Sequence, residues 1–322
     1  MSEFLLNIDD LKVYYFTLEG IVKAVEGVHL KIGKGEALGL VGESGCGKST
    51  TAHSILRLVK KPGKIVEGKI WFENEDLLAK SEAEMREIRG ARIAMIFQNP
   101  MTSLNPVFTV GSQIAESIKL HQNVEKREIE EKVLEILDKV GIPSARERMK
   151  DYPHEYSGGM CQRAMVAMAL SCNPNLLIAD EPTTNLDVTI QAQILDLLRA
   201  LRKEFGASIL LIGHDLGVIS ELCDKVAVMY AGKLIEHADL ATLFKEAKHP
   251  YTQALLGSIP RLDLETERLR VIPGVVPRLI NPPPGCRFHP RCEYVKEICR
   301  KEEPPLIEIK QGHTVACFLY GS

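Results

Sequence analysis

The segment 42–49 constrains the chain more than any other feature, because its sequence GESGCGKS fits the pattern G-x-x-x-x-G-K-[ST]. The apolar run 37–41 precedes it and the helix-like segment 50–59 follows it. Glycines allow successive backbone N–H groups to turn toward one anion, and the amino end of a helix adds its dipole. We therefore predict a loop that binds the phosphates of a nucleotide. Its residues are Gly42, Ser44, Gly45, Cys46, Gly47, Lys48, Ser49 and Thr50.

Four residues carry the expected chemistry of this site. The Lys48 ammonium is expected to reach the β- and γ-phosphates of the nucleotide, and the Ser49 hydroxyl to bind Mg²⁺. Such a site also needs an acidic magnesium ligand at the end of a neighbouring strand, and Asp180 directly follows the apolar run 176–179. Glu181 comes next, where a carboxylate can orient the attacking water as a general base. The sequence therefore predicts magnesium-dependent hydrolysis of a nucleoside triphosphate.

The order of apolar runs predicts an α/β fold, and the motif at 42–49 makes it one of the P-loop NTPase type. Helical periodicity in 125–140 and 191–205 alternates with short apolar runs that are typical of buried parallel strands. Those runs are 36–41, 93–97, 176–179 and 208–212. The first 35 residues instead alternate apolar and polar side chains, which predicts strands with one buried face and hence a separate antiparallel β subdomain.

Proline content divides the chain at about residues 245–255. Prolines are frequent beyond residue 249 and predict a loop-rich segment of short elements. We therefore predict a nucleotide-binding domain at 1–248 and a C-terminal extension at 249–322. The long gap between Lys48 and Asp180 leaves room for a largely helical insertion at about 100–172. This insertion contains a turn opening a helix at Ser157 and Gly159, which is either a second anion-binding helix start or, as we prefer for the turn taken alone, only a helix cap.

The composition of the chain limits which partners it can bind and in which compartment it can work. The net charge of −3 and the pI of about 6.3 do not favour nucleic-acid binding. We see no apolar run of membrane-spanning length and no basic region typical of a secretion signal, so we expect a reducing compartment. In that setting the four late cysteines favour a metal site over disulfides, although their spacing fits neither common zinc sites nor ferredoxins. They are Cys286, Cys292, Cys299 and Cys317.

In order and content, the motifs of residues 4–245 resemble the ATP-binding subunits of ABC transporters. The resemblance rests on the phosphate loop and on the motifs at Gln98, Ser157, Asp180-Glu181, Asp187 and His214. Closer still, the segments QNPMTSLNP (98–106), ADEPTT (179–184) and DVTIQAQ (187–193) are similar to the ATPase subunits of oligopeptide and dipeptide importers. The tail segment HPYTQAL (249–255) and the Pro-rich cysteine region resemble the C-terminal extension of that subgroup.

The resemblance implies a role for each motif. Two subunits would pair head to tail, with Ser157 and Gly159 of one touching the ATP of the other and Asp187 at the seam. Gln98 would sense magnesium and the attacking water, and His214 would hold the γ-phosphate in line with Glu181. Tyr15 would stack on adenine, with Tyr14 as the alternative if the register shifts by one residue. Cys46, beside Lys48, is either only a small residue that fits the turn or a residue whose side chain is a reactive thiolate.

The resemblance also implies partners, cargo and a further cofactor. The chain would act at the cytoplasmic face of the cell membrane, with a second ATPase subunit, two transmembrane permease subunits and an extracytoplasmic peptide-binding protein. Its cargo would be di- or oligopeptides, with nickel complexes as the alternative. The four late cysteines would hold a [4Fe–4S] cluster, with zinc as the alternative and His289 or His313 as substitute ligands. Two other classes stay open: a soluble ABC ATPase not coupled to transport, and an iron–sulfur redox regulator with a vestigial ATPase.

Overall fold

The computed structural model describes residues 4–184, 186–259 and 272–321. Its contacts group the chain into two compact units. The first unit contains residues 1–79 and 212–322, and the second contains residues 80–211. The chain passes from the second unit to the first within strand β8 (Ser208–Gly213). The two units are therefore described one at a time.

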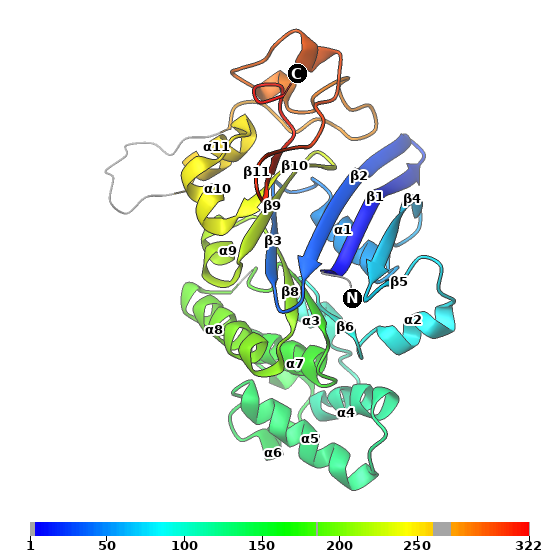
Figure 1. Ribbon diagram of the computed structural model, residues 1–322. Coiled ribbons are helices and arrows are strands. Elements are labelled where there is room, and N and C mark those ends of the chain that lie inside the picture. Colours follow the sequence, from blue (N-terminus) through cyan, green and yellow to red (C-terminus); the bar gives the residue numbers. More distant parts are fainter. Residues whose placement is uncertain (1–3, 185, 260–271, 322) are drawn as a thin grey trace. The chain divides into compact units, whose positions relative to one another are not determined.

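An antiparallel sheet forms much of the amino-terminal part of the first unit. Its strands lie in the order β2-β1-β4-β5, and Figure 1 shows β2, β1 and β4 side by side. Their bounds are β1 (Phe4–Thr17), β2 (Gly20–Gly33), β4 (Gly63–Phe72) and β5 (Glu75–Asp76). In β1, Leu11 and Val13 are fully buried, and Leu11 pairs with the buried Val28 of β2. The strands predicted from alternating side chains are confirmed.

The first unit also contains strands in the order β11-β12-β10-β9-β3. Their bounds are β3 (Ala37–Val41), β9 (Lys225–Tyr230), β10 (Lys233–Asp239), β11 (Ile307–Lys310) and β12 (His313–Val315). Strands β3 and β9 are parallel, whereas β10 pairs antiparallel with both β9 and β12. The C-terminal hairpin β11–β12 thus extends this sheet, a pairing that the sequence did not suggest. The domain boundary at residue 248 stays a prediction.

Helix α1 (Lys48–Ile55) follows the phosphate loop, but it is shorter than the helix expected at 50–59. It ends because Leu56 leaves helical geometry and Arg57 adopts a left-handed φ of 53°. The other helical segments of this unit are short. They are α9 (Leu216–Leu222), α10 (Leu240–Glu246), α11 (Pro250–Gly257) and the 3₁₀ turns η2 (His289–Arg291) and η3 (Ile298–Arg300).

The second unit combines parallel strands with most of the long helices. Strand β7 (Leu176–Asp180) lies between β8 and β6 (Ile93–Ile96), and Ile96 pairs with Ala179. The helical segments are α2 (Glu82–Ile88), α3 (Pro100–Ser103), α4 (Val110–His121), α5 (Lys126–Lys139), α6 (Ala145–Arg148), η1 (Pro153–Glu155), α7 (Gly158–Leu170) and α8 (Val188–Phe205). Helices α5 and α8 confirm the two amphipathic helices that the sequence predicts. Across the described ranges, no helix is both long and apolar enough to span a bilayer.

A buried carboxylate joins the C-terminal segment, which begins at about residue 248, to the sheet that contains β9 and β10. Glu236 of β10 has no exposed surface. One of its oxygens accepts from the Lys248 backbone N–H at 2.7 Å and lies 2.8 Å from His313 Nε2, and the other accepts from the His249 backbone N–H at 2.9 Å. One side chain therefore fixes both the start of α11 and strand β12. Because buried donors without an acceptor are costly, all three partners depend on Glu236.

We predict that Glu236→Leu lowers the free energy of unfolding by at least about 3 kcal/mol, because several buried donors lose their acceptor together. Urea denaturation of the full chain measures this change. The matched control is Glu297→Gln, since Glu297 is an exposed acid that pairs with the exposed Lys301. It should shift stability by no more than about 0.5 kcal/mol. Equal stability of Glu236→Leu and the parent protein would show that the buried carboxylate does not secure this segment.

Candidate active site

The glycines of the phosphate loop occupy positions where a side chain has no room. Gly42 has a φ of 149° and Gly47 a φ of 105°, both outside the range that other residues adopt easily. A Cβ atom at Gly42 would lie 2.2 Å from the Met229 carbonyl oxygen, and one at Gly47 would lie 2.4 Å from the Ala24 carbonyl oxygen. The backbone of the loop therefore packs directly on neighbouring backbone. Only glycine allows this approach at both positions.

Lys48 holds the loop in its curled form. Its side chain is buried, and its ammonium donates to the carbonyl oxygens of Gly42 at 2.7 Å and Glu43 at 3.1 Å. The N-cap of α1 is Gly47, which has no side chain that could accept from the first amides of the helix. These amides and the lysine thus form an electropositive end of a helix, the usual setting for a bound phosphate. Ser44 and Gly45 lie exposed at the rim of the loop.

The structure contradicts the hypothesis of a reactive thiolate at Cys46. Its side chain is fully buried behind the loop, and its sulfur accepts a long contact of 3.8 Å from Lys48 Nζ. Burial raises the pKa of the Cys46 thiol more strongly than the nearby lysine lowers it. The neutral thiol is therefore the stable form, and Cys46 acts as a small side chain that fills the space behind the loop.

The two adjacent tyrosines of β1 have different surroundings. The Tyr15 hydroxyl lies 3.4 Å from Thr50 Oγ1, on the helix that begins at the phosphate loop. The Tyr14 hydroxyl instead donates to Glu26 at 2.8 Å, and burial together with this bond raises the pKa of Tyr14 to about 12. Because successive residues of a strand face opposite sides, only one of the two can point to the loop. The geometry places Tyr15 on that side.

In the second unit, two predicted catalytic side chains meet. Gln98 comes just after β6 and Glu181 just after β7, and these parallel strands end at the same edge of the sheet. The Gln98 Nε2 donates to Glu181 Oε2 at 2.8 Å. Asp180, the last residue of β7, is buried. The Glu181 backbone has a left-handed φ of 47°, a strained conformation that is typical of functional positions.

Thr184 also contacts Glu181, although the sequence alone did not suggest a role for this threonine. Its hydroxyl donates to the same oxygen of Glu181 at 3.0 Å. Two donors thus converge on Glu181 Oε2 and fix the direction of the carboxylate. The spacing of Glu181 and Thr184 in the segment ADEPTT was the available signal, because a turn brings residues three apart into contact.

Two of the remaining motif residues of the second unit, Ser157 and Asp187, cap helices. Ser157 is exposed, and its hydroxyl caps α7 by accepting from the Met160 N–H at 3.3 Å. A Cβ atom at Gly159 would lie 3.2 Å from the Ile190 side chain. Asp187 is exposed and caps α8 by accepting from the Ile190 N–H at 3.0 Å. Both caps leave their helices' amino ends at the surface, where a ligand can approach.

His214 belongs to the first unit and lies apart from the loop in sequence. It directly follows β8 and precedes Asp215, whose side chain caps α9 by accepting from the Gly217 N–H at 2.7 Å. The imidazole is exposed. A buried strand followed by a capped helix therefore holds the histidine at the end of the strand, as the sequence predicts.

The four late cysteines come together, but not as a metal site. All four are free and line one small pocket. Among the described residues, however, no group of three or more His, Cys, Asp or Glu side chains is placed to hold a metal ion. Burial raises the pKa of Cys286 to about 12 and also raises the pKa of Cys292 and Cys317. The predicted [4Fe–4S] cluster is therefore wrong, and the zinc alternative has no support.

The two histidines considered as substitute ligands have other partners. His289 Nδ1 lies 2.9 Å from the Cys286 carbonyl oxygen, and His313 Nε2 lies 2.8 Å from Glu236 Oε1. The Cys299 sulfur accepts from the Lys296 N–H at 3.4 Å. These bonds orient the groups within the C-terminal segment. The four cysteines line the small pocket of this segment.

Two known protein families match parts of this chain. Residues 25–184 match the ABC transporter family. Residues 235–299 match the family described as the C-terminal region of oligopeptide/dipeptide transporters. The second match covers α10, α11 and η2 and ends within η3. The two matches thus include the phosphate loop, the Gln98–Glu181 pair and the cysteine-rich segment up to Cys299.

Similar proteins have been described in several bacteria. The chain is 52% identical to the oligopeptide transport ATP-binding protein AppD of Bacillus subtilis over 317 residues, which is 98% of this chain and 97% of AppD. It is 49% identical to the oligopeptide transport ATP-binding protein OppD of Escherichia coli over 317 residues, or 98% and 94% of the two chains. It is also 49% identical to the dipeptide transport ATP-binding protein DppD of Bacillus subtilis over 318 residues, or 98% and 95%.

Solved structures confirm the predicted α/β P-loop NTPase fold. The dimeric ATP-binding cassette MJ0796, bound to ADP and Pi after hydrolysis, matches with a TM-score of 0.66 and 26% identity over 73% of this chain and 98% of that one. CbiO1 of Clostridium perfringens, part of the ABC transporter complex CbiONQ, matches with a TM-score of 0.65 and 27% identity over 76% and 92%. The chain belongs to the ABC transporter family, among the ATP-binding subunits of oligopeptide/dipeptide transporters.

Proposed function

We propose that this chain hydrolyses ATP to power the import of di- and oligopeptides through a membrane ABC transporter. The observation that carries the proposal is the phosphate loop, in which two glycines without room for a side chain place the backbone around the buried Lys48. The names of the relatives AppD, DppD and OppD support the assignment of peptides as cargo. They do not favour the nickel alternative.

The phosphate loop would bind the triphosphate of ATP. Lys48 would exchange its bonds to the Gly42 and Glu43 carbonyl oxygens for bonds to the β- and γ-phosphates. Mg²⁺ prefers hard oxygen ligands, and the Ser49 hydroxyl, the Asp180 carboxylate and the Gln98 amide oxygen would serve as such ligands. When bound, the magnesium ion neutralises phosphate charge. The exposed Ser44 and Gly45 would contribute backbone amides at the rim, and Tyr15 would stack on the adenine ring.

Glu181 would act as the general base. The bonds from Gln98 and Thr184 to Oε2 orient its carboxylate, so that the base is positioned before the water arrives. Asp180 precedes it at the buried end of β7 and would serve magnesium rather than the water. His214 would hold the γ-phosphate in line with the water. Through its bond to Glu181, Gln98 would relay the state of the nucleotide to other subunits.

The exposed helix ends of the second unit support a head-to-tail pair of ATPase subunits. Ser157 and Gly159, at the start of α7, would contact the nucleotide bound by the partner subunit, and Asp187 would lie at the seam between the two. The family further implies two transmembrane permease subunits and, indirectly, an extracytoplasmic peptide-binding protein. The chain would then be a peripheral protein at the cytoplasmic face of the cell membrane. A soluble ABC ATPase not coupled to transport is the alternative to this assembly.

We predict that Glu181→Gln lowers the rate of ATP hydrolysis by about 10²–10⁴-fold, the usual contribution of a general base. ATP binding should persist, because the phosphate loop is unchanged. Phosphate release measured with the purified chain and its companion subunits tests the rate, and calorimetry with Mg-ATP tests binding. The matched control is Glu135→Gln, at an exposed acid of α5 that contacts Lys139. Undiminished turnover by Glu181→Gln would remove Glu181 from the role of base.

We also predict that the chain, assembled with its permease subunits in vesicles, supports ATP-dependent uptake of a labelled oligopeptide. Uptake should cease in Lys48→Ala, since the ammonium that binds the β- and γ-phosphates is lost. A labelled nickel chelate, tested in the same vesicles, should not enter. Failure of the chain to co-purify with permease subunits, together with undisturbed ATPase activity, would instead support a soluble ABC ATPase.

A further inference from the structure

An acidic residue lies within the phosphate loop, and three of its groups are held in place. The backbone N–H of Glu43 donates to the Tyr251 hydroxyl at 2.9 Å. Its carbonyl oxygen accepts from Lys48 Nζ at 3.1 Å. Its carboxylate accepts two bonds from the Arg291 guanidinium, one at 2.8 Å and one at 3.1 Å. Two of these three partners, Tyr251 and Arg291, belong to the C-terminal segment.

Arg291 is itself fixed from several sides. Its side chain is 3% exposed. Its Nε donates to the Pro273 carbonyl oxygen at 2.8 Å, and a terminal nitrogen donates to the Tyr230 hydroxyl at 3.3 Å. The guanidinium carbon lies 5.8 Å from the centre of the Tyr230 ring and 6.0 Å from that of Phe288, within range of a cation–π contact. Burial disfavours the charge, but the bonds to Glu43 and Tyr230 raise the pKa of Arg291, so it stays a cation.

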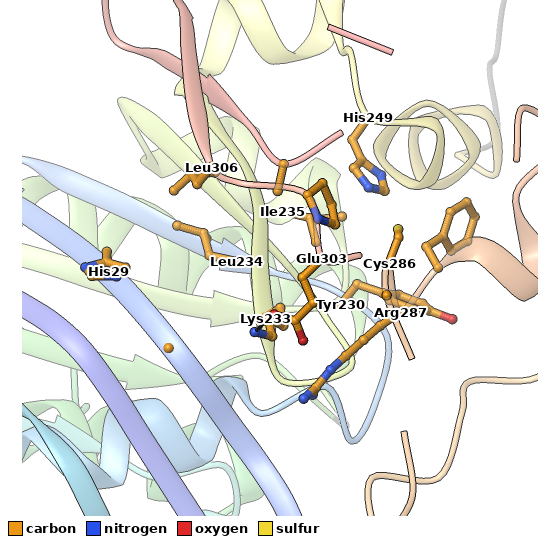
Figure 2. Close-up of a pocket in the computed structure, with 15 residues that line it drawn as sticks. His29, Tyr230, Lys233, Leu234, Ile235, His249, Cys286, Arg287, Glu303 and Leu306 are labelled. Atoms are coloured by element: carbon orange, nitrogen blue, oxygen red, sulfur yellow. Dashed lines mark hydrogen bonds and ion pairs between the residues drawn. The ribbon is translucent and has the colours of Figure 1, made fainter. Parts of the chain in front are cut away.

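Aromatic rings connect the arginine to Tyr251. The ring centres of Tyr230 and Tyr251 are 4.7 Å apart, and Phe288 lies 5.2 Å from the first and 5.4 Å from the second. A second buried arginine of the same segment, Arg287, donates to the Ala231 carbonyl oxygen. Figure 2 shows Arg287 and Tyr230 among the residues lining a pocket next to this cluster. The C-terminal segment is therefore built against the residues that support the phosphate loop.

The arrangement has an electrostatic consequence for ATP. A carboxylate within a loop that receives a triphosphate repels the ligand unless its charge is neutralised. Arg291 supplies that neutralisation through two parallel hydrogen bonds, which also fix the direction of the carboxylate. Because Tyr251 holds the amide of the same residue, the first turn of the loop is ordered before a nucleotide binds. Preorganisation of this kind increases affinity, since less ordering remains to be done on binding.

We propose that Arg291 and Tyr251 are positioning residues for the phosphate loop: the C-terminal segment holds Glu43 and neutralises its charge, and so sets the affinity for ATP. The inference rests on the proposed role of this loop in binding ATP. It gives the C-terminal segment a function that does not depend on a metal. It also predicts that Arg291 acts on ATP only through Glu43.

A double-mutant cycle on the full chain tests this, with the dissociation constant for Mg-ATP measured by calorimetry. Arg291→Gln alone should weaken ATP binding about tenfold, because it leaves the Glu43 carboxylate without its cation. In the Glu43→Gln background the same substitution should change the constant by less than about twofold, since no charge remains to be neutralised. The melting temperature should fall in both backgrounds, because the bonds to Tyr230 and Pro273 are lost in each, and it should fall further where Glu43 is present, because the ion pair with Arg291 is lost as well.

The control is Glu303→Gln, which breaks the ion pair between Glu303 and Lys233 in the same C-terminal segment without touching the loop. It should leave ATP affinity unchanged. Equal weakening by Arg291→Gln in both backgrounds, or none in either, overturns the proposal. If Arg291→Gln does not fold, Arg291→Lys and Tyr251→Phe decide, each expected to weaken binding about threefold. A parent chain that does not bind Mg-ATP would instead refute the function of the loop itself.

Discussion

The absence of space behind the phosphate loop is the constraint on which the first unit depends. A Cβ atom at Gly42 or Gly47 would meet a carbonyl oxygen of a neighbouring strand, Met229 of β9 in one case and Ala24 of β2 in the other. The Gly232 N–H also donates to the Cys46 carbonyl oxygen at 2.9 Å. The loop is thus confined between strands of two sheets. Its shape is therefore set by backbone packing within the fold, which holds its amides in fixed positions.

The parts of the fold that the sequence predicts well are those with a local pattern. Strands such as β3 and β7 are continuous runs of buried residues, and α5 and α8 show a clear apolar face, so each element can be recognised from its own residues. The phosphate loop is likewise local. The meeting of Gln98 and Glu181 follows once β6 and β7 are known to be parallel neighbours, because residues after paired strands share one edge.

The parts that could not be predicted depend on contacts between distant residues. Strand β12 joins β10 through two residue pairs, and the buried Glu236 binds groups on two later segments, yet none of these residues carries a local signal of its partner. The cysteines show the same limit in another form. Their clustering in sequence correctly suggests that they approach one another, but spacing says nothing of the geometry and ionisation that a metal demands.

The pairing of Glu43 with Arg291 shows how a local motif and a contact between distant residues combine. A phosphate loop has no electrostatic reason to contain an acid, so Glu43 is out of place when the loop is considered alone. It becomes explicable when a buried cation of the C-terminal segment requires a counter-ion, since a guanidinium without one would not remain at 3% exposure. Each charge therefore offsets the desolvation cost of the other. The same bond that stabilises the C-terminal segment orders the loop, so loss of either partner is expected to affect both.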